Sequence, residues 1–105
     1  MIDINDSEFL SRIEPKELLD KVCDGKTAAA MIQPGDILGI SGFTPCGYPK
    51  ITMHELAERM KQTPCQVDIW TGASTGSQID TELVAVNGIR NRMPYQTNAN
   101  LRKAI

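Results

Sequence analysis

Two glycine-containing stretches hold the residues whose types and spacing best suit chemistry. The first runs from Ser41 to Lys50 and has two glycines and two prolines within eight residues. Proline fixes φ and glycine permits conformations closed to other residues, so the loop has a defined shape and accessible backbone N–H groups. Such groups suit a carbonyl oxygen, a carboxylate or a phosphate. An ordinary turn between a strand and a helix would use the same glycines, so both interpretations stand at this point.

The second stretch, from Gly72 to Gly76, places Ser74 and Thr75 between its glycines. Their hydroxyls are potential donors to a substrate, although a strand-to-helix turn with a Ser or Thr N-cap would look the same. Two such loops at the same end of adjacent parallel strands are typical of a ligand crevice. The Tyr95-Gln96-Thr97-Asn98 stretch also has polar groups suited to orienting a substrate, or to a turn with an Asn helix cap. The predicted pocket residues are Ser41, Gly42, Phe43, Thr44, Gly47, Gly72, Ser74, Thr75 and Gln96.

Other chemically interesting residues lack the partners that they would need. Gly25-Lys26-Thr27 looks like the end of a phosphate-binding P-loop, but Asp20 stands where that motif requires its first glycine. His54 is the only histidine and falls on a predicted helix surface, so we expect no metal site. Cys46 or Ser41 would act as a nucleophile only beside a general base, which the sequence does not mark.

The scaffold that positions the loops is predicted from turn and strand signals. Pro34-Gly35 suits a type II turn, because Pro presets φ and Gly accepts a positive φ. The apolar run Ile37 to Ser41 predicts one strand, and the alternation over Val67 to Thr71 predicts a second. A helix between them completes a βαβ unit, which implies parallel pairing and a right-handed crossover. The fold class is therefore α/β, with a small parallel sheet and flanking helices.

The helix between the strands is predicted to begin at a capping box formed by Thr52 and Glu55 and to end at Thr63-Pro64. Its apolar stripe comprises Met53, Leu56, Ala57 and Met60, while Glu55, Glu58, Arg59 and Lys61 are expected to face water.

A helical segment over 7–32 is predicted to precede the first strand. It consists of a helix over about 7–13, a second that starts at Pro15 and is closed by Gly25, and a third capped by Thr27. After the second strand we expect a helix from Asp80 to Val86 closed by Asn87-Gly88. A short strand from Ile89 and a last helix from Asn98 or Asn100 follow.

Length and composition allow one domain at most over residues 1–105, which we expect to be part of a larger α/β domain. A net charge of −2 with scattered Lys and Arg gives no electrostatic basis for nucleic-acid binding. The acidic start is no secretory signal, and no apolar run approaches a membrane span. Cys23, Cys46 and Cys65 are odd in number and widely spaced, which argues against disulfides and favours a reducing cytoplasm.

Three ordered motifs resemble the acetyl-CoA hydrolase/transferase family of class I coenzyme A-transferases. The first is Asp36 followed by Ser41-Gly42-Phe43 and Gly47-Tyr48-Pro49, within the run that ends at Lys50. The second is Ile69-Trp70-Thr71-Gly72-Ala73-Ser74-Thr75-Gly76. The third is Arg92-Met93-Pro94-Tyr95-Gln96-Thr97-Asn98, which leads into 101–105. The resemblance covers nearly the whole chain but only the N-terminal part of the family, whose members are several-fold longer.

The resemblance implies an enzyme that transfers CoA between a short-chain acyl-CoA and acetate, succinate or propionate, or that hydrolyses acetyl-CoA. A glutamate in a second domain would form a glutamyl-CoA intermediate. We therefore assign no catalytic residue in this chain, whose glutamates all fall on predicted helices or their starts: Glu8, Glu14, Glu17, Glu55, Glu58 and Glu82. CoA is then a substrate and no cofactor is expected.

The expected partners are an acyl-CoA, a short carboxylate, and a second domain or partner subunit. Apolar surface meant for that neighbour would favour a homo-oligomer or self-association. The alternative function is a non-catalytic binding or subunit-interaction domain derived from the same fold.

Overall fold

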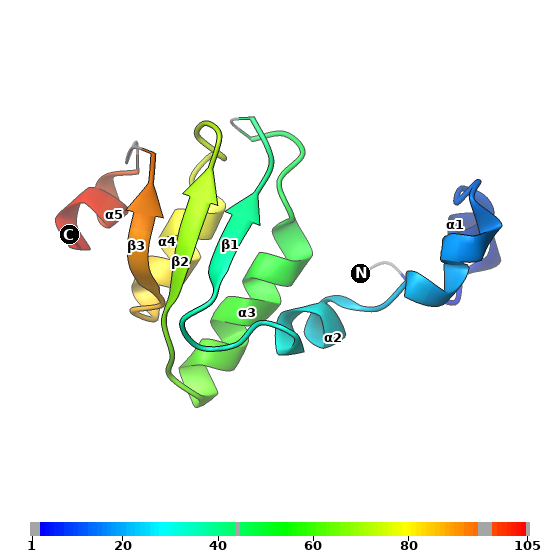
Figure 1. Ribbon diagram of the computed structural model, residues 1–105, viewed down its shortest axis with the longest axis horizontal. Coiled ribbons are helices and arrows are strands. Elements are labelled where there is room, and N and C mark those ends of the chain that lie inside the picture. Colours follow the sequence, from blue (N-terminus) through cyan, green and yellow to red (C-terminus); the bar gives the residue numbers. More distant parts are fainter. Residues whose placement is uncertain (1–2, 44, 95–97, 105) are drawn as a thin grey trace.

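The computed structural model describes residues 3–43, 45–94 and 98–104 (Figure 1). Helices and strands follow one another in the order α1 (Ser7–Ser11), the 3₁₀ helix η1 (Lys16–Lys21), α2 (Gly25–Ala30), β1 (Ile37–Ile40), α3 (Lys50–Gln62), β2 (Val67–Thr71), α4 (Gln78–Ala85), β3 (Ile89–Met93) and α5 (Ala99–Ala104). Within these ranges, no helix is long and apolar enough to cross a membrane.

The strands form one parallel sheet in the order β1-β2-β3. Helices α3 and α4 lie against one face of it, behind the strands in Figure 1. The predicted small parallel α/β sheet with flanking helices is therefore confirmed, as is the strand that begins at Ile89.

The core forms where the apolar stripe of α3 meets the sheet and α4. Met53, Leu56, Ala57 and Met60 are 4% exposed or less, which confirms the predicted stripe. They belong to one buried cluster with side chains of β1, β2 and α4, among them Ile40, Val67, Ile69, Ile79 and Leu83.

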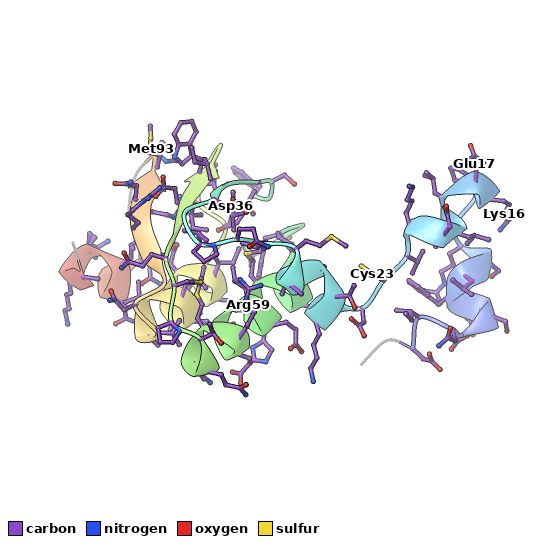
Figure 2. All side chains as sticks on the ribbon, turned by 60° about the horizontal axis from the view of Figure 1, so that its bottom comes forward. Lys16, Glu17, Cys23, Asp36, Arg59 and Met93 are labelled. Atoms are coloured by element: carbon purple, nitrogen blue, oxygen red, sulfur yellow. The ribbon has the colours of Figure 1, made fainter. Side chains whose placement is uncertain are left out.

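Arg59 does not face water as predicted. Its guanidinium donates to the backbone carbonyl of Ala29 (2.5 Å) and to that of Ile32 (2.6 Å), at the end of α2. Arg59 thus reaches from α3 toward α2 (Figure 2), where it adds hydrogen bonds to carbonyls at the C-terminal end of that helix. The prediction was wrong because sequence periodicity does not show that α2 packs beside this side of α3.

The turn before β1 forms as predicted, whereas the start of α3 differs. Gly35 has a φ of 84°, and the N–H of Asp36 donates to the carbonyl of Gln33 (3.1 Å). Helix α3 begins at Lys50, directly after Pro49, and the N–H of Met53 already bonds the Pro49 carbonyl (3.3 Å). The predicted capping box is wrong because Thr52 lies inside the first turn.

Two predicted caps in the N-terminal segment are also wrong. Gly25 opens α2 instead of closing the preceding helix, and Asp24, not Thr27, caps it. The Asp24 carboxylate accepts a hydrogen bond from the backbone N–H of Thr27 (2.8 Å), which lowers the pKa of Asp24. A Cβ on Gly25 would lie 2.5 Å from Cγ2 of Ile51, so glycine permits the close approach of α2 to α3.

The segment before α2 stands apart from the sheet. It forms α1 and η1, neither of which contains a buried residue, and it projects to one side of the molecule in Figure 1. The second predicted helix is thus the 3₁₀ helix Lys16–Lys21, with Pro15 as its N-cap.

The predicted end of α4 is confirmed, although α4 begins two residues before the predicted start at Asp80. Asn87 has a φ of 53°, and its N–H donates to the carbonyl of Val84 (3.0 Å). The N–H of Gly88 donates to the carbonyl of Leu83 (2.8 Å). These are the two bonds of a Schellman motif.

The start of α5 is confirmed as well. Oδ1 of Asn98 accepts a hydrogen bond from the N–H of Leu101 (3.0 Å), so Asn98 is the N-cap, one of the two predicted starts.

The face of the sheet opposite α3 and α4 carries large exposed apolar side chains. Ile37, Trp70 and Met93 are 58%, 46% and 48% exposed. Trp70 pairs with Met93 in the register between β2 and β3. This open face, defined by these three residues, resembles surface that another structural layer would cover, since parallel sheets are usually covered on both faces.

Candidate functional site

The two predicted loops lie at the same edge of the sheet. Ile40 and Thr71 pair in register at the carboxyl ends of β1 and β2, and a loop leaves the sheet from each of them. Both loops are at the top of Figure 1. We name them loop 1 (residues 41–49) and loop 2 (residues 72–77). Their adjacency is the arrangement in which open α/β sheets bind ligands.

Loop 1 folds back on itself through its own backbone. The N–H of Phe43 donates to the carbonyl of Cys46 (3.0 Å), and the N–H of Cys46 donates to that of Phe43 (3.1 Å). Gly42 has a φ of 145°, and a Cβ added to it would lie 3.0 Å from Cβ of Tyr48. Gly47 has a φ of 75°. Both glycines therefore hold conformations that other residues rarely adopt.

The remaining predicted residues of loop 1 are accessible. Ser41 and Gly47 are exposed, and Phe43 is 70% exposed beside Cys46, a free thiol. Thr44 lies outside the described residues. The loop thus offers an aromatic ring and a hydroxyl at the sheet edge.

Loop 2 connects β2 to α4 and turns at Gly76, which has a φ of 81°. The N–H of Gly76 donates to Oγ of Ser74 (3.4 Å), and Ser74 is half-buried. Thr75 is 1% exposed, and its hydroxyl has no hydrogen-bond partner within the described ranges. Ser77 is the N-cap of α4 but forms no side-chain cap bond. Helix α4 therefore lacks the Ser side-chain cap that an ordinary strand-to-helix turn would supply.

Tyr48 joins loop 1 to the start of α4, directly after loop 2. Its hydroxyl donates to Oε1 of Gln78 (2.6 Å), the first residue of α4. The ammonium of Lys50 lies 4.0 Å from the centre of the Tyr48 ring, a cation–π contact. Sequence reasoning missed the Tyr48–Gln78 hydrogen bond because the two residues are thirty positions apart. The only signal was that Tyr48 lies within the first motif and Gln78 lies two residues after the second.

A buried ion pair lies beneath loop 2. Nε of Arg92 on β3 donates to Oδ1 of Asp80 on α4 (2.9 Å), and the two side chains are 2% and 3% exposed. Nη1 of Arg92 donates to Oγ1 of Thr71 (3.0 Å) and to the backbone carbonyl of Met93. The sequence placed Arg92 at the start of the third motif and Asp80 at the start of a helix, but it predicted no contact between them. The available signal was an arginine at a position of β3 that faces the core.

Asn98 fixes the other side of loop 2. Its Nδ2 donates to Oγ1 of Thr81 (3.0 Å) and to the carbonyl of Ser77 (3.3 Å). Asn98 was predicted either to orient a substrate or to cap a helix, and it caps α5 and also anchors the first turn of α4. The neighbouring Gln96, predicted to line the pocket, lies outside the described residues, as do Tyr95 and Thr97.

The other sequence candidates lie away from the loops. Nδ1 of His54 is 3.3 Å from the carboxylate oxygens of Glu82 on the molecular surface. Across residues 3–43, 45–94 and 98–104, no group of three or more His, Cys, Asp or Glu side chains could hold a metal ion. A cavity of about 380 Å³ lies between the N-terminal segment and α2 and α3, with Phe9, Cys23 and Ile51 in its lining.

A parallel sheet with two glycine-containing loops at its carboxyl edge defines a small α/β domain, and in open α/β sheets this edge is where ligands usually bind. The chain matches the acetyl-CoA hydrolase/transferase N-terminal domain over residues 8–105, and it belongs to that family. This confirms the resemblance drawn from the three motifs.

Curated relatives carry related activities. The chain is 43% identical over 96 residues to a succinyl-CoA:acetate CoA-transferase of Clostridium kluyveri, and this match covers 90% of the chain and 18% of the relative. It is 39% identical over 83 residues to a propanoyl-CoA:succinate CoA transferase of Escherichia coli (74% and 17%). It is 29% identical over 99 residues to an acetyl-CoA hydrolase of Neurospora crassa (90% and 19%). The chain thus spans less than a fifth of these relatives.

Proposed function

We propose that this chain is the N-terminal part of an enzyme that transfers CoA between a short-chain acyl-CoA and a carboxylate such as acetate, succinate or propionate. Hydrolysis of acetyl-CoA would result if water replaced the carboxylate. The observation that carries the proposal is the 43% identity to a succinyl-CoA:acetate CoA-transferase over 90% of the chain. The meeting of loops 1 and 2 through Tyr48 and Gln78 supports it.

The loops would form walls of the acyl pocket. Loop 1 turns at two glycines with positive φ, whose backbone N–H groups would face the substrate, and loop 2 would contribute the Ser74 hydroxyl. Fixed donors of this kind stabilise the negative charge that develops on a thioester oxygen under attack. Gly42, Phe43, Gly47 and Ser74 are the residues on which we base this role.

The nucleophile would come from another part of the complete enzyme. The glutamates within the described ranges do not lie on loops 1 or 2, and Glu82 approaches His54. A glutamate carboxylate would attack the thioester carbonyl and expel CoA thiolate, leaving an acyl-glutamyl anhydride. The thiolate would then attack the glutamyl carbonyl, releasing the carboxylate product and forming glutamyl-CoA. CoA would thus act as a substrate and not as a cofactor. We place the enzyme in acetate metabolism in the cytoplasm. The 105 residues alone would be inactive, because the nucleophile lies outside them.

The test is CoA exchange by the complete enzyme. We expect acetyl-CoA and succinate to give succinyl-CoA and acetate, or acetyl-CoA alone to give free CoA. Incubation with acyl-CoA and no acceptor should add the mass of a CoA thioester to the protein. The proposal would be refuted if the complete enzyme showed no CoA exchange and no hydrolysis with acetyl-, propionyl- and succinyl-CoA.

A second candidate function is a binding or subunit-interaction domain without chemistry. The observation that favours it is the open sheet face with Ile37, Trp70 and Met93 exposed. If this second function is correct, we expect the isolated chain to self-associate. If the chain is instead a catalytic part, a polypeptide that supplies the rest of the enzyme should restore CoA exchange. A monomer that unfolds cooperatively would argue against the self-association.

A further inference from the structure

We propose that Arg92 is a positioning residue that fixes loop 2, and with it Ser74, by joining from β3 the two segments between which this loop runs. The inference rests on the proposed function, because it takes loop 2 to be a wall of the acyl-CoA site. Arg92 itself would touch no substrate.

The contacts of Arg92 bracket loop 2. Thr71 is the last residue of β2, directly before the loop, and Asp80 is the third residue of α4, directly after it. One guanidinium donates to the Thr71 hydroxyl (3.0 Å) and to the Asp80 carboxylate (2.9 Å). The same group bonds the Met93 carbonyl, at the end of its own strand. A single side chain therefore fixes the distance between the two ends of loop 2.

The burial of this pair argues for positioning rather than for stability alone. The side chains of Arg92 and Asp80 are 2% and 3% exposed. Removing two charges from water costs about as much as their attraction returns, so a buried ion pair adds little net stability over an apolar pair. Arginine instead fixes the directions of several hydrogen bonds at once, because its planar group holds several donors in a rigid fork that lysine lacks.

Arg92 also acts on the contact between the loops. Gln78, which accepts the hydrogen bond from Tyr48, lies two residues before Asp80 on the first turn of α4. Movement of this turn would shift loop 2 and the anchor of loop 1 together. Arg92 is thus placed to set the geometry of both predicted walls.

The first experiment separates positioning from stability in the complete enzyme. Arg92→Met leaves the Asp80 charge buried and unpaired, and we expect it to lower the melting temperature. The double variant R92M/D80L replaces the pair by apolar groups and should recover most of that loss. It still lacks the bonds to Thr71 and Met93, so kcat should remain about 10- to 100-fold low. A stable R92M/D80L enzyme with kcat within about twofold of the wild type would overturn the proposal.

The second experiment tests the route through Ser74. Arg92→Lys keeps the charge beside Asp80 but loses the fork. If Arg92 acts by placing Ser74, then R92K should reduce kcat much less in an S74A background than in the wild type. The route would be contradicted if R92K lowered kcat by the same factor in both backgrounds, or if the S74A enzyme had the wild-type kcat. R90M/D68L is the matched control: it replaces the other Arg–Asp pair between β2 and β3, whose Arg90 side chain is 49% exposed, and kcat should not change.

A measurement that needs no activity keeps this inference separate from the proposed function. We expect R92K, and not R90K, to speed hydrogen exchange over residues 72–85 and to leave 50–62 unchanged. Equal exchange in R92K and the wild type would overturn the positioning role. An enzyme that exchanges no CoA but shows the faster hydrogen exchange would refute the proposed function alone.

Discussion

Loop 1 is shaped by its own backbone, whereas loop 2 is held by side chains from β3, α4 and the cap of α5. In loop 1, the Phe43–Cys46 bridge and Gly42 packed on Tyr48 are contacts within eight residues. In loop 2, the holding groups are Arg92 and Asn98, about twenty residues further along the chain.

The difference teaches where each loop is vulnerable. A change of backbone conformation at one glycine should disturb loop 1 and leave the sheet unaffected. Loop 2 should respond to changes in the buried polar network beneath it, which also joins β2, β3 and α4. Changes that disturb loop 2 should therefore also loosen the packing of β2, β3 and α4, whereas the strain of a glycine substitution should stay within loop 1.

The largest effect is expected at Asp80. Asp80→Ala leaves the buried Arg92 charge without its carboxylate, which should lower the free energy of unfolding by about 3–5 kcal/mol. Denaturant unfolding of the complete protein measures the loss. Glu82→Ala, two residues along the same helix and paired only at the surface, should cost less than about 1 kcal/mol. Similar losses in the two variants would show that the buried network does not hold α4.

The next effect is expected at Gly42. Gly42→Ala forces an alanine to a φ of 145° and against Tyr48, which should cost about 1–3 kcal/mol. The fold should remain intact while CoA turnover falls. Gly39→Ala, where an added Cβ meets no atom within 4 Å, is the control on β1. Unchanged turnover in Gly42→Ala would remove loop 1 from the site.

A smaller effect is expected where the loops meet. Tyr48→Phe removes the hydroxyl that donates to Gln78, a change of about 1 kcal/mol in stability. In the Tyr48→Phe background, Gln78→Ala should cause no further loss of unfolding free energy. A double-mutant cycle measures this coupling. Additive losses would mean that the two loops are independent.

The smallest effect concerns acid stability at the other end of β2. Two hydrogen bonds from Arg90, with a third from Asn91, lower the pKa of Asp68. A carboxyl whose pKa is lower in the folded state stabilises the fold above its unfolded pKa of about 3.9, and this stability is lost as the pH falls through the folded pKa.

Asp68→Asn should therefore flatten the fall in melting temperature below about pH 4. It should leave CoA turnover at neutral pH unchanged, because Asp68 lies away from both loops. An identical acid profile in the wild type and the variant would contradict the role of Asp68.

Much of the fold was predictable from local patterns. The type II turn at Pro34-Gly35, the two first strands, the α3 stripe and the Asn87-Gly88 cap depend on residues within one turn or strand. The βαβ pattern, which implies parallel strands, placed loops 1 and 2 at one sheet edge. Where two local signals competed, the sequence misled: Asp24 caps α2 in place of Thr27, and α3 begins at Lys50 before its apparent capping box.

The sequence alone thus determined the parallel α/β scaffold, the backbone-shaped loop 1 and the family. Only the tertiary structure revealed that Arg59 serves α2, that Tyr48 reaches Gln78, and that Arg92 and Asp80 pair beneath loop 2. The physical reason is range. Backbone propensities and periodicity act between near neighbours, whereas a hydrogen bond from a long polar side chain depends on which distant segment the packed fold brings within about 3 Å.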